Sequence, residues 1–159
     1  MPTITQHAIE RLHALGLELP ASPPRPGGSY VPVRVRGGLA FVACQFPFKD
    51  GTPAFRGRLG AELSTADGVA AARLAALNAL AQLHHNVGLD RLEGLCRFEM
   101  YLQCGPGWDE MPAVLDGASR LFLDVLGEEL GSHSRAPIGV AQLPLNLPVE
   151  LVLTAAVRA

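Results

Sequence analysis

The last quarter of the chain, Ser132–Glu150 (SHSRAPIGVAQLPLNLPVE), is an apolar run whose charged residues are one arginine, Arg135, and one glutamate, Glu150. An ionised side chain is rarely buried without a partner. We therefore expect these two side chains to lie exposed at strand ends, to form an ion pair that braces adjacent strands, or to bind a ligand. The rest of the chain decides between these alternatives.

Working outward from this run, hydrophobic periodicity predicts a helix followed by the order β-β-α-β-α-β-β. A Gly37-Gly38 pair, which suits a two-residue hairpin turn, separates the first two strands, and Ser64 with Asp67 forms a capping box before the long alanine-rich helix. The expected elements are a helix near Ile4–Leu15, strands Tyr30–Arg36 and Leu39–Cys44, a helix from Ser64 to about Val87, a strand at Leu92–Cys104, a helix from Pro112 to about Gly127, and strands Ala136–Gln142 and Val149–Val157.

The 92–104 strand alternates apolar and polar residues, which is typical of a half-buried strand. This alternation predicts that Cys96, Phe98, Met100 and Leu102 share the buried face. The proline-rich stretch Pro20–Gly28 cannot continue the front helix, because proline lacks the amide donor and fixes φ. We therefore divide the chain into residues 1–27, a helix with a proline-rich linker, and a single domain at residues 28–159.

Composition excludes several classes of protein. The 159 residues carry a net charge of −2 with scattered basic residues, which argues against a nucleic-acid partner. Hydrophobic residues make up 48% and charged residues 18%, an apolar surplus that we interpret as a subunit interface. Three cysteines without a CxxC pair argue against a disulfide framework or a zinc site. No signal peptide or membrane span is recognisable, so we expect a cytoplasmic protein without a membrane partner.

Few residues are candidates for chemistry. No serine stands in a G-x-S-x-G elbow, and no H-E-x-x-H or carboxylate cluster suggests a metal. Two glycine motifs, Gly57-x-x-Gly60 and Gly105-x-Gly107, lack the strand-to-helix setting of a phosphate-binding loop. What remains is Arg135 and Glu150, and we list as their possible neighbours Tyr30, Gln45, Asp116 and His133.

An ordered series of short motifs resembles the reactive intermediate deaminase family, RidA or YjgF. The series consists of Gly28-Ser29-Tyr30-Val31-Pro32, Phe41-Val42-Ala43-Cys44-Gln45-Phe46-Pro47, Asn78-Ala79-Leu80, Arg135, Leu143-Pro144 and Val149-Glu150. The match runs from about Gly28 to Val157, and the extra front helix is similar to an uncharacterised branch of the family.

The resemblance implies an α+β, chorismate-mutase-like fold with two helices packed on one face of the sheet. It also implies a homotrimer with ligand sites between subunits and no cofactor or metal. In such a protein Arg135 grips a substrate carboxylate and Glu150 lies near the attacking water, so both are the expected catalytic residues. The implied reaction hydrolyses small carboxylate-bearing enamines or imines to ammonia and a 2-oxo acid. Tyr30 lines the cleft, and the remaining positions expected to bind substrate are Cys44, Gln45, Asp116 and Pro137.

The chain departs from the catalytic branch at several of these positions. Cys44 replaces a glycine and Asp116 stands where asparagine is frequent. His133 and Ser134 precede the arginine in place of Pro-Ala, and Pro137 replaces a cysteine and lacks an amide donor. Carboxylate binding is therefore predicted more directly than turnover, and a non-catalytic trimeric protein that binds a 2-oxo acid is the alternative. A ribonuclease ranks last, because the sequence has no basic track.

Overall fold

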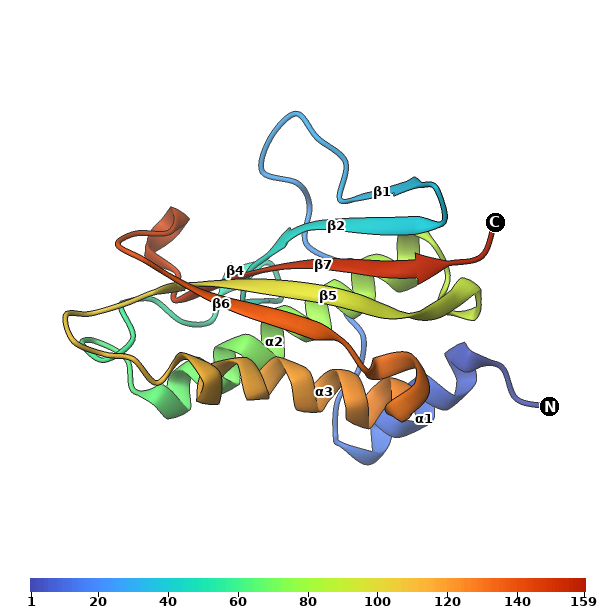
Figure 1. Cartoon of the computed structure of the whole chain (residues 1–159), viewed down its shortest axis with the longest axis horizontal. Coiled ribbons are helices and arrows are strands. Elements are labelled where there is room, and N and C mark those ends of the chain that lie inside the picture. Colours follow the sequence, from blue (N-terminus) through green and yellow to red (C-terminus); the bar gives the residue numbers. More distant parts are fainter.

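The computed structural model describes all 159 residues and contains a five-stranded sheet in the order β1-β2-β7-β5-β6 (Figure 1). Its strands are β1 (Val33–Arg36), β2 (Leu39–Gln45), β5 (Leu92–Gln103), β6 (Ser134–Val140) and β7 (Val149–Val157). β5 and β6 are parallel, and the other neighbouring pairs are antiparallel. A separate hairpin, β3 (Phe48–Lys49) and β4 (Thr52–Pro53), follows β2. The predicted α+β class and order of elements are confirmed.

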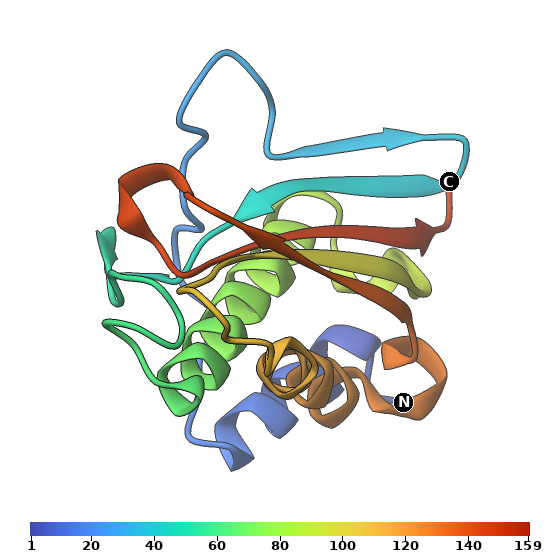
Figure 2. The ribbon, with the colours of Figure 1, turned by 60° about the vertical axis from the view of Figure 1, so that its left-hand side comes forward.

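Helices α2 and α3 cover one face of the sheet, and α1 packs beside α3 (Figure 2). The helical elements are α1 (Ile4–Ala14), α2 (Thr65–Asn86), α3 (Met111–Gly131) and the short 3-10 turns η1 (Leu89–Arg91) and η2 (Pro144–Asn146). The predicted capping box of α2 is present, since Ser64 and Asp67 exchange side-chain and backbone hydrogen bonds. None of these helices has the combination of length and apolar character required to cross a bilayer.

The core lies between the sheet and the two long helices. Phe98 of β5 and Phe122 of α3 are fully buried and meet edge to face, with ring centroids 5.7 Å apart. The front helix adds to this same core, because Ala8 and Leu12 are each only 1% exposed. Residues of the first 27 therefore pack against the domain rather than project from it.

Two local predictions need correction. Cys96 does not share the buried face with Phe98, because the register between β5 and β7 shifts between Leu95 and Arg97. This irregularity buries Leu95 and leaves Cys96 exposed. The second correction concerns α3, which was expected to stop near Gly127. Gly127 adopts a φ of 79° that kinks the chain, and helical structure resumes for one more turn to Gly131.

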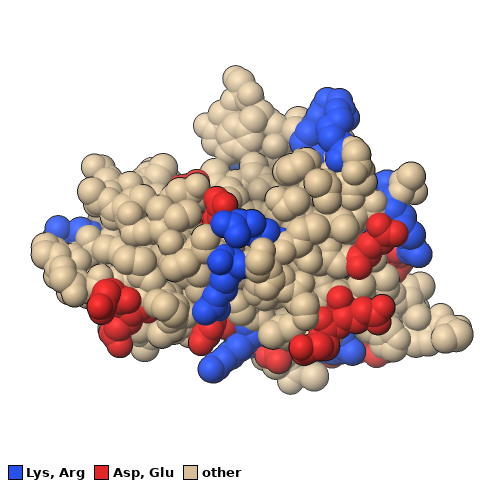
Figure 3. All heavy atoms as spheres, viewed as in Figure 1, with Lys and Arg blue, Asp and Glu red and all other residues tan.

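The opposite face of the sheet has no helical cover. Side chains that alternate with the buried ones point to this open face, among them Phe41, which is 45% exposed, and Thr154, its partner in the register of β2 and β7. On the side of the molecule shown in Figure 3, basic and acidic side chains are interspersed rather than gathered by sign. The long apolar strands thus leave one sheet surface partly apolar and accessible within the single chain.

Candidate functional site

Arg135 and Glu150 lie on opposite faces of the sheet. Arg135 on β6 is in register with the buried Phe98, and its side chain reaches α3 on the helix-covered face. Glu150 on β7 alternates with the buried Val149 and Leu151, so its side chain points to the open face. The alternative of an ion pair between the two residues is therefore not realised within one chain, and one chain does not bring both into a single cleft.

The guanidinium of Arg135 is held by groups on α3. Its Nη1 donates to Oδ1 of Asp116 at 2.7 Å and to Oγ of Ser119 at 2.9 Å, and its Nη2 donates to the carbonyl of Pro112 at 3.4 Å. Asp116 and Ser119 are three residues apart and so project from the same side of the helix. The Arg135 side chain is 28% exposed and that of Asp116 45%, which places the ion pair at the surface of the sheet edge.

His133 completes this group from the start of β6. Its Nε2 lies 2.9 Å from Oγ of Ser119 and its Nδ1 lies 2.6 Å from the carbonyl of Gly131. The imidazole also contacts the aromatic core, with ring centroids 5.0 Å from Phe98. We call Arg135, Asp116, Ser119 and His133 the arginine cluster. Asp116 and His133 were predicted as possible neighbours of Arg135, whereas Ser119 was not, although its spacing from Asp116 could have indicated it.

Glu150 lies instead in a groove of about 1910 Å³ at the end of the sheet. Cys44 and Gln45 of β2 line this groove, as do Tyr30 and the linker that runs from α1 to β1 (Figure 2). We call Glu150, Cys44, Gln45, Tyr30 and their surrounding walls the glutamate groove. It brings together four of the predicted site residues and leaves the other three, Arg135, Asp116 and Pro137, outside its lining.

Burial and the nearby Glu150 together alter the Cys44 thiol of this groove. Burial, followed by the negative charge of Glu150 and a hydrogen bond to its carboxylate, raises the pKa of the Cys44 thiol to about 11. The thiol is therefore protonated at neutral pH, because removing its proton would place a second negative charge beside Glu150. A thiol in this state is a hydrogen-bond donor and not a nucleophile.

Buried amides tie the linker to the end of β2. Gln82 of α2 is 1% exposed and donates from Nε2 to the carbonyl of Pro24 at 2.7 Å and to Oε1 of Gln45 at 3.3 Å. Gln45 in turn donates to the carbonyls of Ala43 and Cys44. Gln45, which was expected to bind substrate, is 4% exposed and in this chain braces the strand that carries Cys44. Gln82 was not predicted, because nothing local distinguishes it from other helical glutamines.

Tyr30 lies at the edge of the glutamate groove, and Pro137 lies on β6 near the arginine cluster. Tyr30 is 48% exposed, and its hydroxyl accepts a hydrogen bond of 3.1 Å from the amide of Gly27, which closes the end of the linker. Pro137 is exposed on β6 and in register with Met100. The β5–β6 ladder runs without a shift past this proline, as expected on an edge strand where one backbone side is unpaired.

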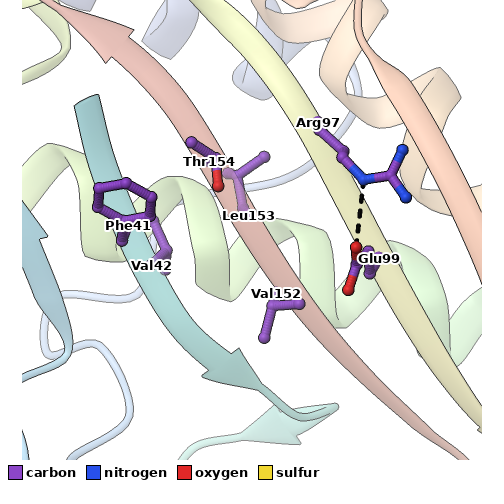
Figure 4. A pocket seen from close by; sticks show the side chains of 7 residues that line it. All are labelled: Phe41, Val42, Arg97, Glu99, Val152, Leu153 and Thr154. Carbon is purple, nitrogen blue, oxygen red and sulfur yellow. Dashed lines mark hydrogen bonds and ion pairs between the residues drawn. The ribbon is translucent and has the colours of Figure 1, made fainter. Parts of the chain in front are cut away.

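A smaller hollow of about 190 Å³ lies on the open face of the sheet (Figure 4). An ion pair of 3.2 Å between Arg97 and Glu99 forms one side, and the exposed Phe41 lies on the other. No residue of this hollow was predicted to carry function. No group of three or more metal-ligating side chains is formed anywhere in the chain.

Comparison with known proteins places this geometry in a family. The sequence model of the family described as "YjgF/chorismate_mutase-like, putative endoribonuclease" matches residues 9–157. Protein TCP17 of Trypanosoma cruzi is 38% identical over 141 residues, which cover 88% of each chain.

Two solved structures share the whole architecture. The protein Atu1372 from Agrobacterium tumefaciens, of unknown function, superposes with a TM-score of 0.90 at 32% identity, covering 98% of this chain and 95% of its own. A "putative endoribonuclease" from Shewanella oneidensis has the same TM-score at 38% identity, with coverages of 94% and 99%. The motif series, the fold and these matches agree, and the chain belongs to the YjgF (RidA) family.

Proposed function

We propose that this protein is a RidA-like hydrolytic deaminase that acts on small carboxylate-bearing enamines or imines and releases ammonia and a 2-oxo acid. The observation that carries the proposal is the state of Arg135, whose guanidinium is fixed at the sheet edge with part of its donor set unused. An arginine held in this way is suited to a carboxylate, which matches its planar fork.

The donors of Arg135 indicate how the carboxylate would bind. Both hydrogens of Nη1 are engaged by Asp116 and Ser119, whereas Nη2 makes one long contact and Nε makes none. The free fork is therefore the edge formed by Nε and Nη2. A substrate carboxylate placed on this edge receives two parallel hydrogen bonds without displacing Asp116.

Glu150 is the proposed base. Its carboxylate can accept a proton from water as the water adds to the C=N carbon, a role that typically contributes about 10² to 10⁴-fold to the rate. The thiol of Cys44 stays protonated beside this carboxylate and does not compete as a nucleophile. After water has added, collapse of the carbinolamine expels ammonia and leaves the 2-oxo acid.

The proposal requires a second copy of the chain, since Arg135 and Glu150 occupy opposite faces of one sheet. We propose a cyclic homotrimer in which the edge of β6 from one subunit meets the glutamate groove of the next. In a cyclic assembly every copy uses the same two different surfaces, so three equivalent sites are formed. The partly apolar open face of the sheet supports such an association. The expected solution mass is three times the chain mass of 16.8 kDa.

Turnover tests the reaction. Ammonia release from imines generated enzymatically from amino acids should be faster with the protein than without it, and Arg135→Ala and Glu150→Gln should each abolish the acceleration. Arg120→Ala is the matched control, because Arg120 is exposed on α3 and forms no hydrogen bond or ion pair. Equal rates for Arg135→Ala and wild type would contradict the proposed role.

Complementation tests the shared site. Arg135→Ala and Glu150→Gln chains, co-expressed with different tags and purified as mixed oligomers, should recover activity because one intact site per mixed trimer combines an unaltered arginine with an unaltered glutamate. About one third of the wild-type activity is expected from this arithmetic. No recovery in verified mixed oligomers would mean that each site is built within one chain.

Binding without turnover is the second candidate, and a specific observation favours it. Pro137 supplies no amide donor beside Arg135, and Cys44 occupies space next to Glu150, so carboxylate capture could persist where water activation is lost. Saturable calorimetric binding of pyruvate, together with no ammonia release after prolonged incubation with imines, would establish this function in place of the first.

A further inference from the structure

We infer that Ser119 and His133 are positioning residues that set the orientation of the Arg135 guanidinium, an inference that rests on the proposed carboxylate-binding role of Arg135. Neither residue reaches the free Nε–Nη2 edge of the arginine. Their contacts instead form a directed chain of hydrogen bonds that ends on Nη1.

The direction of each hydrogen bond follows from the chemistry of its partners. The Gly131 carbonyl can only accept, so Nδ1 of His133, 2.6 Å away, carries a proton. In the neutral imidazole, Nε2 is then an acceptor, and the Ser119 hydroxyl donates to it across 2.9 Å. With its proton committed to the imidazole, Oγ of Ser119 presents lone pairs to Nη1 of Arg135.

The base of this chain is rigid. Ser119 is 9% exposed within α3, and the His133 ring packs between the aromatic rings of Phe98 and Phe122 at centroid distances of 5.0 and 5.8 Å. Neither side chain can rotate far without breaking this packing. The serine oxygen is therefore a fixed point for the arginine.

Two hydrogen bonds to Nη1 restrict the orientation of the guanidinium more than one hydrogen bond does. Without Ser119, the guanidinium keeps only the contact to Asp116, whose side chain is itself 45% exposed, and the long contact of Nη2 to the Pro112 carbonyl, so the planar group can swing. The second contact, to Ser119, stops this swing and keeps the Nε–Nη2 edge turned outward. Ligand binding then requires less ordering of the arginine side chain, which favours affinity.

The experiment measures binding of pyruvate by calorimetry and the KM and kcat of imine hydrolysis. Ser119→Ala should weaken pyruvate binding about 3- to 10-fold and raise KM by a similar factor, with kcat nearly unchanged, because a hydrogen bond to a charged group is lost one step from the ligand. His133→Phe, which keeps an aromatic ring in the packing, should have the same effect. His133→Gln, which restores an acceptor for the serine hydroxyl, should recover part of the affinity.

Ser132→Ala is the matched control, since Ser132 lies at the C-terminal end of α3 next to His133. Its hydroxyl donates only to the carbonyl of Glu128. This variant should bind pyruvate as the wild type does. If Ser119→Ala does not fold, as judged by thermal unfolding, the His133→Phe and His133→Gln pair carries the test.

The outcomes separate this inference from the proposed function. Unchanged binding in Ser119→Ala and His133→Phe, with binding lost in Arg135→Ala, would overturn the positioning role and leave the carboxylate site in place. Wild-type binding in Arg135→Ala would overturn the proposed function itself. Weakened binding in the first two variants, with recovery in His133→Gln, is the expected result.

Discussion

Arg135 meets a carboxylate of its own chain, whereas Glu150 forms no ion pair within the chain. The arginine cluster is built from α3 and β6, two packed elements, and the positive charge at its centre is compensated at 2.7 Å. The glutamate groove is built from a strand end and a linker, and the neighbour of its charge is a thiol that cannot neutralise it. The charge of the first region is compensated within one chain, and the charge of Glu150 in the second is not.

This difference indicates how the two regions respond to change. The arginine cluster depends on how closely α3 approaches α2, because Asp116 and Ser119 stand on that helix. The glutamate groove depends on how firmly the linker is attached to α2 and β2. Substitutions in the helix interface should therefore act on stability and on the arginine together, and substitutions in the linker should act on the groove alone.

The largest effect is expected from Gly117→Ala, between Asp116 and Ser119 on α3. A Cβ at Gly117 would lie 2.3 Å from the carbonyl oxygen of Val69, which is backbone and cannot yield as a side chain can. The helices must separate, at a cost of about 3 kcal/mol in the free energy of unfolding. Denaturant unfolding measures this loss.

Gly27→Ala in the linker is the control, because a Cβ there meets nothing within 4 Å. It should change the free energy of unfolding by no more than about 0.5 kcal/mol. Equal stability of the two variants would show that α2 and α3 accommodate a Cβ at Gly117 without separating.

A second comparison concerns the attachment of the linker. Gln82→Leu keeps the volume but removes the buried donor to Pro24, so about 1 to 3 kcal/mol of stability should be lost. The backbone amide of Gly27, which donates to the hydroxyl of Tyr30, should also exchange faster with solvent. Gln142→Leu, at an exposed position, should change neither quantity. Slow exchange in Gln82→Leu would mean that other contacts hold this wall of the groove.

The sequence predicted the helices and strands of both regions more accurately than the directions in which their side chains point. Periodicity placed the final strand at Val149–Val157, and alternation along it follows from local pattern. The face to which the Arg135 side chain points is not determined locally, because it depends on the parallel pairing of β6 with β5. The sequence therefore left open an ion pair between Arg135 and Glu150, two residues that lie on opposite faces of the sheet within one chain.

The contacts made by the helices were predictable only in part. Asp116 and His133 were expected as possible neighbours of Arg135 and Glu150, and both lie in the arginine cluster. Ser119 and Gln82 were missed, since each acts through a partner far away in the chain: His133 for the serine, and Pro24 for the glutamine. Polar residues inside apolar helical faces acquire their role from tertiary packing, which periodicity does not encode.

Asp116→Asn tests the charge difference between the two regions, because it removes the carboxylate that compensates Arg135. The variant keeps an oxygen that can accept from Nη1 but removes the negative charge beside Arg135. Pyruvate should bind about threefold more tightly, because the exposed pair is partly screened and worth less than about 1 kcal/mol. Asp124→Asn, exposed further along α3, should bind as the wild type does. Weaker binding in Asp116→Asn would mean that the ionised carboxylate is needed to hold the arginine in place.

The effect expected at Cys44 is absent at neutral pH and appears only at alkaline pH. Because burial and the charge of Glu150 raise the pKa of this thiol from 9.0 to about 11, the folded state holds the proton more tightly than the unfolded state does. The resulting stability is fully present below pH 9.0 and is lost as the pH rises through about 11. Wild type should therefore lose more unfolding free energy than Cys44→Ala across this pH interval. Subtracting the two curves of unfolding free energy against pH removes the contribution of the other titrating groups. Parallel curves would mean that the thiol does not interact with Glu150, and the carboxylate of Glu150 would then be open to a ligand or to a neighbouring subunit.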